Sequence, residues 1–354
     1  MSITIRTKNF LSSIFFLCIA YMLYTKLPYY RNYFGGSYNF PFLKASIRTL
    51  EAFSWVFALY AAFLFLIFFL EKNPKVGKGV NALRALKKIF SHPLDSFEKG
   101  IPRDEKIALL AILLKIFFTP LLISWLLSNS SKFFSEGGSL IHSSFLSGGF
   151  ILLFREHLFL MLFNLILLVD VLFFSFGYLV ELDLFKNKII SVDPTLLGWV
   201  FTLICYPPFN NYASYALLWK STDFPYFANP YLFLTLNISI LLLMGIYSWA
   251  SVSLGAKASN LTHRGIVACG PYRFVRHPAY ACKNAAWWLG GVPFIISAVK
   301  AGIIPVFLVI FSLTSWTMVY SIRAVTEEEH LMSVNDEYKE YIKKVPYRFM
   351  PFII

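Results

Sequence analysis

Residues 270–280 read GPYRFVRHPAY, a polar, basic and aromatic stretch that leads directly into an apolar segment. The pair Gly270-Pro271 predicts a turn. Pro278 suits the first turn of a helix, where its missing N–H would be unpaired in any case, so we expect a helix to begin there and enter a membrane. Because the rest of the chain is mostly apolar, this polar stretch is where we expect its chemistry.

A second polar group follows on the far side of an apolar stretch. Arg323 comes 43 residues after Tyr280, which leaves room for two membrane crossings of about 20 residues each. The two groups therefore end on the same side of the membrane, and we expect them to line one polar pocket. The second group consists of Arg323, Glu327, Glu328 and Leu331.

The composition is that of a membrane protein. Of the 354 residues 57% are hydrophobic and only 14% are charged, whereas a soluble domain carries roughly 25% charged residues. The net charge of +13 would suit a nucleic-acid-binding protein. The basic residues stand in short loops between apolar segments, however, so we expect no nucleic acid as a partner. The four cysteines show neither paired nor metal-ligating spacing, and we expect no metal.

The apolar segments predict an all-α, polytopic integral membrane protein of about eight transmembrane helices, with a C-terminal helical hairpin and a cytoplasmic tail helix. A further segment, residues 80–90, has one apolar face and is either an interfacial helix on anionic lipid or an ordinary solvated helix. The clear crossings are residues 50–70, 107–127, 158–180, 230–249 and 303–322. The shorter ones, which must be tilted or partly interfacial, are residues 9–25, 196–207 and 284–298.

The distribution of basic residues predicts the orientation. The loops on the same side as the N-terminus carry 22 Lys and Arg residues and the opposite loops carry 8. This places the N-terminus, the polar stretch 270–280, which we call the motif loop, and the C-terminus in the cytoplasm. We expect a bacterial inner membrane rather than the endoplasmic reticulum. Lys115 and Asp170 fall near the middle of predicted crossings. Intramembrane charges mark functional sites by default, and a structural pair between the two is the alternative.

The predicted pocket suits a zwitterionic ligand with an additional positive centre. The helix end at Pro278 has free N–H groups and basic neighbours, including Arg273, and attracts anions such as a carboxylate. Nearby aromatic faces, such as those of Tyr272 and Tyr280, can hold a cation. The acidic residues across the hairpin can hold an ammonium group or ribose hydroxyls. S-adenosylmethionine, which has a carboxylate, an ammonium and a sulfonium, fits all of these features.

Three motifs in the last third of the chain resemble the isoprenylcysteine carboxyl methyltransferase and phospholipid methyltransferase superfamily. Those enzymes show an RHPxY loop, a membrane hairpin, an RxxxEExxL step and an EYxxYxxxVP tail. The resemblance covers about residues 240–354, and its order and spacing make it far more specific than RHP alone. The matching residues are Arg276, His277, Pro278 and Tyr280, then Arg323, Glu327, Glu328 and Leu331, then Glu337, Tyr338, Tyr341, Val345 and Pro346.

The resemblance implies a methyltransferase that uses S-adenosylmethionine and acts on a lipid-like acceptor entering from the bilayer. It divides the chain into an N-terminal transmembrane region of unknown role, residues 1–235, and a catalytic region, residues 236–354. Catalytic roles are implied for Arg323 and Glu327. Arg323 could orient a carboxylate by a two-pronged contact, whereas an amine acceptor needs a base, either Glu327 or His277. The residues implied to hold the cofactor are Tyr272, Arg276, His277, Pro278, Tyr280, Glu327 and Glu328.

Two stretches depart from the family pattern. Cys282, Lys283 and Asn284 differ from the eukaryotic carboxyl methyltransferases, which bears on a prenylcysteine substrate more than on the cofactor. Val334 and Asn335 stand where many relatives have Phe-Gly. Because asparagine tolerates the left-handed conformation, we expect the turn at this point to be kept.

Two other functions fit parts of the sequence. Sterol-type reductases that use NADPH have a similar C-terminus with a VPYR-like step, here residues 345–348, but they lack the paired glutamates. A non-catalytic transporter or lipid-binding protein would explain the long N-terminal part and the intramembrane charges. Transporters often carry two related halves, however, and this chain shows none.

Overall fold

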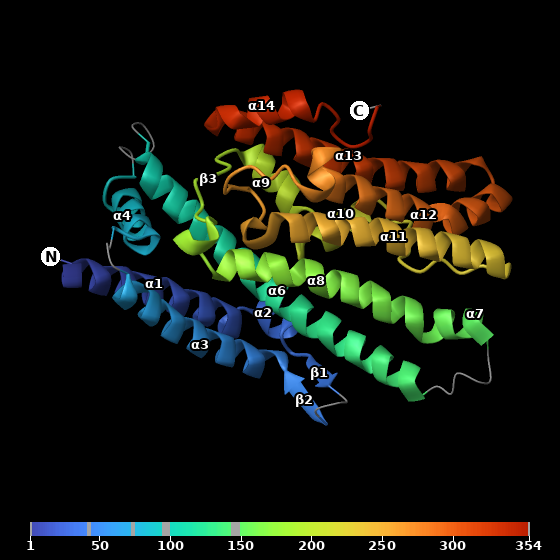
Figure 1. Cartoon of the computed structure of the whole chain (residues 1–354), viewed down its shortest axis with the longest axis horizontal. Coiled ribbons are helices and arrows are strands. Elements are labelled where there is room, and N and C mark those ends of the chain that lie inside the picture. The colour runs from blue at the N-terminus through green and yellow to red at the C-terminus, as the bar shows by residue number, and fades with distance from the viewer. Residues whose placement is uncertain (1, 41–43, 72–74, 94–99, 143–148, 353–354) are drawn as a thin grey trace. The chain divides into compact units, whose positions relative to one another are not determined.

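Helices make up most of the structure (Figure 1). The computed structural model describes residues 2–40, 44–71, 75–93, 100–142 and 149–352. Within them the strands form two short antiparallel pairs, β1 (Ser37–Phe40) with β2 (Ala45–Arg48) and β3 (Ser191–Val192) with β4 (Thr262–His263). The predicted all-α, polytopic class is confirmed.

The helices differ in length, and the connections that precede α9, α11 and α12 are the longer ones in the second half of the chain. The α-helices are α1 (Ser2–Lys26), α2 (Pro28–Tyr33), α3 (Thr49–Leu70), α4 (Lys78–Ser91), α6 (Arg103–His142), α7 (Gly149–Leu153), α8 (Phe159–Leu179), α9 (Leu196–Leu203), α10 (Phe209–Ala216), α11 (Pro230–Leu254), α12 (Pro278–Ala301), α13 (Ile303–Val334) and α14 (Asp336–Lys344). Among the described residues, a π-helical turn spans Phe154–Leu158, and 3₁₀ turns span Asp183–Phe185, Gly255–Lys257 and Gly270–Arg273.

The chain forms two compact units. The first comprises the described residues up to 131 together with 178–180, and the second comprises those from 132 to 177 and from 181 onward. The predicted functional division at residue 235 is a different boundary and stays a prediction.

In the first unit α1 packs against α3 and α4. Tyr24 and Phe53 are buried between α1 and α3, with ring centres 5.1 Å apart. In α4, Ala82 and Ala85 are fully buried while Arg84 is exposed. The helix predicted over residues 80–90 is therefore confirmed, and its place at a membrane surface stays a prediction.

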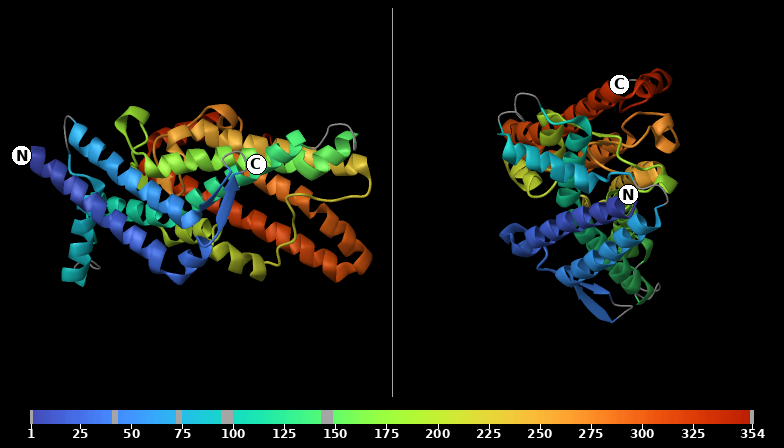
Figure 2. Two further views of the ribbon diagram at one scale, coloured as in Figure 1. Left: turned by 90° about the horizontal axis from the view of Figure 1, so that it is seen from below. Right: turned by 90° about the vertical axis from the view of Figure 1, so that its left-hand side faces the viewer.

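In the second unit α12 packs between α11 and α13, and the views of Figure 2 show α12 and α13 side by side. Ala286 of α12 lies in the same buried cluster as Ile240 and Met244 of α11. Gly302 joins α12 to α13 at φ +120°, in the backbone region that favours glycine. The two helices thus form the predicted hairpin, which brings the start of α12 to the end of α13.

Local sequence explains where these helices begin. Helix α12 starts at Pro278, as predicted. Before α11, the Asn229 side chain accepts hydrogen bonds from two backbone N–H groups of the first turn. Asn335 caps α14 in the same way, accepting from the Glu337 N–H at 2.8 Å. The expected turn between α13 and α14 is kept, but Asn335 has φ −151° and not the left-handed conformation, because a capping asparagine needs extended backbone.

Among the residues that the structure describes, six helices are long and apolar enough to cross a membrane, and the predicted count of eight is not confirmed. The predicted crossing over residues 196–207 is wrong, because α9 has only 8 residues and is about 12 Å long. Residues 284–298 lie in α12, which is 24 residues long but is not one of the six, since polar Asn284 and its Trp and Gly residues dilute its apolar content. The six are residues 3–26, 49–70, 103–141, 149–179, 230–257 and 303–334.

Candidate functional site

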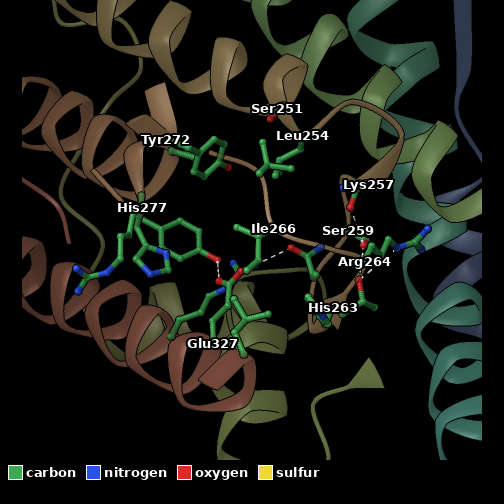
Figure 3. Close-up of a pocket in the computed structure, with 18 of the residues that line it drawn as sticks. Ser251, Leu254, Lys257, Ser259, His263, Arg264, Ile266, Tyr272, His277 and Glu327 are labelled. Carbon is green, nitrogen blue, oxygen red and sulfur yellow. Dashed lines mark hydrogen bonds between the residues drawn. The ribbon is translucent and has the colours of Figure 1, made fainter. Parts of the chain in front are cut away.

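The two polar groups predicted at the ends of the hairpin meet in one pocket. Tyr280 stands in the first turn of α12 and Glu327 near the end of α13, and the Tyr280 hydroxyl donates a 2.7 Å hydrogen bond to Glu327 Oε2. Both residues line a pocket together with Arg323. In Figure 3, Glu327, His277 and Tyr272 surround this pocket from one side.

Residues 345–348, which follow α14 and which we call the C-terminal segment, hold the motif loop in place. The backbone N–H of Arg276 donates to the Tyr347 carbonyl and that of His277 to the Arg348 carbonyl, both at 2.9 Å. From α14 the Tyr341 hydroxyl donates to the carbonyl of Tyr272 at 2.6 Å. These contacts fix the direction in which Tyr272 and His277 face the pocket.

Glu328 is the centre of a buried charge cluster. Its side chain is 2% exposed. It accepts hydrogen bonds from Arg276 Nε at 2.7 Å, from Arg348 Nη2 at 2.7 Å and from His277 Nε2 at 3.0 Å. Arg276 also donates to the carbonyl of Val345. Glu328 therefore joins the motif loop, α13 and the C-terminal segment.

Arg323 is held rigidly at the wall of the pocket. It is 5% exposed, and its Nη2 donates a 2.6 Å hydrogen bond to Asn260 Oδ1. Its guanidinium lies 5.0 Å from the ring centre of Tyr280, 5.6 Å from that of Tyr206 and 5.8 Å from that of Tyr320. Such cation–π contacts stabilise a desolvated guanidinium without consuming its N–H donors.

Most of the predicted site residues share the pocket. Tyr272, Arg276, His277, Tyr280, Arg323 and Glu327 line it. Pro278 and Glu328 are not among the lining residues. Pro278 begins α12, and its neighbour Ala279 reaches the pocket instead. Glu328 supports the wall from behind through its partners.

The comparison with protein families matches the part of the chain that carries this geometry. Residues 231–333 match the model of the isoprenylcysteine carboxyl methyltransferase (ICMT) family. The resemblance predicted from the motifs is confirmed for the C-terminal third of the chain. Neither a curated protein nor a solved structure matches the chain.

The ICMT match begins in α11 and ends near the end of α13, so it contains the whole hairpin. It indicates a membrane methyltransferase that acts on a lipid-like substrate. The C-terminal segment that holds the motif loop lies beyond the matched residues.

Sequence reasoning missed several residues of the ICMT-like pocket. One group comes from the connection after α11, where Lys257, Ser259, His263 and Arg264 line the wall (Figure 3). This stretch, KASNLTHRG, is polar and directly follows an apolar helix. That pattern could have predicted that residues 257–265 contribute to the pocket. Other lining residues that the sequence did not assign to the pocket include Tyr206, Tyr247, Ser251, Asn260, Lys283 and Tyr320.

Asp170, predicted as an intramembrane functional charge or a partner of Lys115, has well-defined neighbours. One of its oxygens accepts from the Tyr247 hydroxyl at 2.8 Å, and the other accepts a short hydrogen bond from Ser251. Both neighbours line the pocket, so Asp170 supports the pocket wall. Its predicted pairing with Lys115 stays a prediction.

Burial shifts the pKa of three residues that line the pocket outside the membrane-spanning segments, Tyr272, Tyr341 and His263. It raises the pKa of Tyr272, with nearby Glu327 adding to the effect, and it raises the pKa of Tyr341 to about 12. Burial also lowers the pKa of His263, and neighbouring His330 and Lys257 act in the same direction. At neutral pH the tyrosines are therefore hydroxyl donors and His263 is uncharged.

Within the described ranges of the chain, no three His, Cys, Asp or Glu side chains come together in a way that could hold a metal ion. A reaction without a metal stays a prediction.

Proposed function

We propose that this protein transfers a methyl group from S-adenosylmethionine to a lipid-like acceptor. The observation that carries the proposal is the convergence of Tyr280, Glu327 and Arg323 on one pocket, in the region that matches the ICMT family. We propose that Tyr272, Arg276, His277, Pro278, Tyr280, Glu327 and Glu328 hold the cofactor, with Pro278 and Glu328 acting by shaping the wall.

The pocket residues fit the chemical groups of the cofactor. Glu327 Oε2 accepts from Tyr280, and no described residue donates to Oε1, so this oxygen can accept from an ammonium or a ribose hydroxyl. Ala279, in the first turn of α12, lines the pocket, and the free N–H groups of such a helix end can bind a carboxylate. The rings of Tyr272 and Tyr280 offer faces for a positive centre.

When bound, S-adenosylmethionine supplies a methyl group on a sulfonium, which an acceptor can take by in-line displacement. The task of the protein is then mainly to position the two partners. Arg323 carries five N–H donors. Asn260 accepts from one of them and Tyr206 also hydrogen-bonds the guanidinium, so donors remain to orient an oxygen of the acceptor. The aromatic contacts of Arg323 keep its guanidinium in one place.

The acceptor decides whether a base is needed. A carboxylate oxygen is already ionised and needs none, whereas an amine must lose a proton. His277 Nε2 is engaged by Glu328 at 3.0 Å, while Glu327 faces the pocket. For an amine acceptor we therefore propose Glu327 as the base.

Binding of the cofactor tests the proposal. We expect purified protein in detergent to bind S-adenosylmethionine in isothermal titration calorimetry. Glu327→Gln should raise the Kd by about 10- to 100-fold, because a hydrogen bond to a charged group contributes about 1.5–3 kcal/mol. Glu329→Gln is the matched control, since Glu329 is two residues away and exposed, and its Kd should not change.

Equal Kd values for Glu327→Gln and the wild type would remove Glu327 from the cofactor site. The acceptor itself can be found by incubating the protein with methyl-labelled cofactor and a native lipid extract, followed by mass spectrometry of the labelled product. Absence of both cofactor binding and labelled lipid in the wild type would refute the proposed function.

A further inference from the structure

Lys283 is a cation in the pocket that the proposed chemistry does not use. It stands one turn beyond Tyr280 in α12 and lines the pocket. Its ammonium lies 5.2 Å from the ring centre of Trp287, 5.6 Å from that of Tyr320 and 5.7 Å from that of Tyr247. Three aromatic rings therefore hold this charge by cation–π contacts.

No residue that the structure describes accepts a hydrogen bond from the ammonium group of Lys283. An ammonium carries three N–H donors, and in the described part of the chain no oxygen accepts from Lys283 and no carboxylate lies within 4.0 Å of its nitrogen. Asp170 and Asp223 act on Lys283 through space, but neither lines the pocket. Both oxygens of Asp170 are engaged by Tyr247 and Ser251. The donors of Lys283 thus remain available to a ligand.

The charges around the pocket point to the sign of that ligand. Of the described residues that line the pocket, Glu327 is the one acidic residue, whereas five are lysine or arginine. Arg276 is neutralised by Glu328 at 2.7 Å, but Lys283 and Arg323 both lie within 6 Å of the ring centre of Tyr320. Two neighbouring cations facing one space favour an anionic partner and disfavour a cationic one.

We infer that Lys283 binds an anionic oxygen, of a carboxylate or a phosphate, in the headgroup of the lipid-like acceptor. In this way it selects acidic acceptors over amine acceptors. The inference rests on the proposed methyl transfer and narrows its substrate class. A lysine among apolar helices is energetically costly and by default marks a functional site, which agrees with this role.

Matched amphiphiles test the inference. Dodecanoate, dodecyl phosphate and dodecylammonium share one chain and differ in the headgroup, and their Kd values can be measured by native mass spectrometry of the full chain in neutral maltoside micelles. We expect both anions to bind at least tenfold more tightly than the ammonium. The anion with the lower Kd shows whether the preferred headgroup is a carboxylate or a phosphate.

Variants assign the preference to Lys283. Lys283→Met, which keeps the length of the side chain, should reduce the preference for anions about tenfold, and Lys283→Arg should keep it. Lys300→Met is the matched control, because Lys300 lies on the same helix and is exposed at its other end. Its preference should equal that of the wild type.

Two results would overturn the inference: equal binding of the three amphiphiles to the wild type, or an unchanged preference in Lys283→Met. The Kd for S-adenosylmethionine, measured on the same samples, separates this failure from that of the proposed function. Normal cofactor binding without anion preference refutes the role of Lys283 alone, whereas anion preference without cofactor binding refutes methyl transfer.

Discussion

Replacing Glu328 by glutamine tests whether the buried charge cluster holds the site together. The wild-type carboxylate is 2% exposed and accepts from Arg276, His277 and Arg348 at 2.7–3.4 Å. Glutamine removes the negative charge and turns an N–H₂ group toward these donors. Removing one partner of a buried ion pair costs about 3–5 kcal/mol, because the remaining charges are left uncompensated.

This loss should appear first where the C-terminal segment meets the motif loop. The N–H groups of Arg276 and His277 donate to carbonyls of that segment, so undocking it exposes them to solvent. At about 1.4 kcal/mol per factor of ten, we expect these amides to exchange with deuterium about 100- to 4000-fold faster in Glu328→Gln. Glu329→Gln changes an exposed neighbour and should leave the exchange unchanged.

Hydrogen exchange measured by mass spectrometry on peptides covering residues 270–280 gives this rate. Protection in Glu328→Gln equal to that of the wild type would refute the reasoning, since the cluster would then contribute nothing to docking the segment. Faster exchange in both glutamine variants would also count against it, because the effect would not depend on the buried cluster.

Two further predictions concern the loop and the polar connection. Gly270→Ala should lower the Tm, because Gly270 has φ +57° and an added Cβ would lie 2.1 Å from Ser253 Oγ. The left-handed backbone alone costs about 1–2 kcal/mol for alanine. Gly245→Ala is the control and should not lower the Tm, because nothing lies within 4 Å of a Cβ added there. Because the pKa of His263 is lowered in the folded protein, its stabilising contribution is complete above the unfolded value of about 6.5 and is lost as the pH falls through the folded value. The Tm of the wild type should thus fall between pH 7.5 and 5.5 by more than that of His263→Gln, and parallel curves would contradict this.

The hairpin and its polar ends could be predicted from the sequence because each depends on local or periodic signals. A proline that follows a turn and precedes apolar residues favours the start of a helix, and Pro278 has this position. The distance from Tyr280 to Arg323 allows two crossings and so brings Tyr280 near Glu327, and the structure places these side chains in hydrogen-bond contact.

Other parts of the site depend on packing between distant segments and left little trace in the sequence. Nothing near Asn260 predicts that it would accept from Arg323, 63 residues later. Lys283 was noticed only as a departure from relatives, because its aromatic neighbours come from three helices. The segment 196–207 is as hydrophobic as a membrane crossing, but its helix, α9, ends at Leu203, shortly before the two prolines at 207–208.

The position of Arg348 has a consequence for biosynthesis. Glu328 is translated 20 residues before Arg348, so during translation the hairpin emerges with a carboxylate that lacks one of its two arginines. Arg276 and His277 are already present and can neutralise the carboxylate in part. The motif loop is not held by all of its contacts, however, until residues 345–348 have been synthesised. Maturation of this enzyme region is therefore a late event, and nascent chains stalled before that point carry an unfinished site.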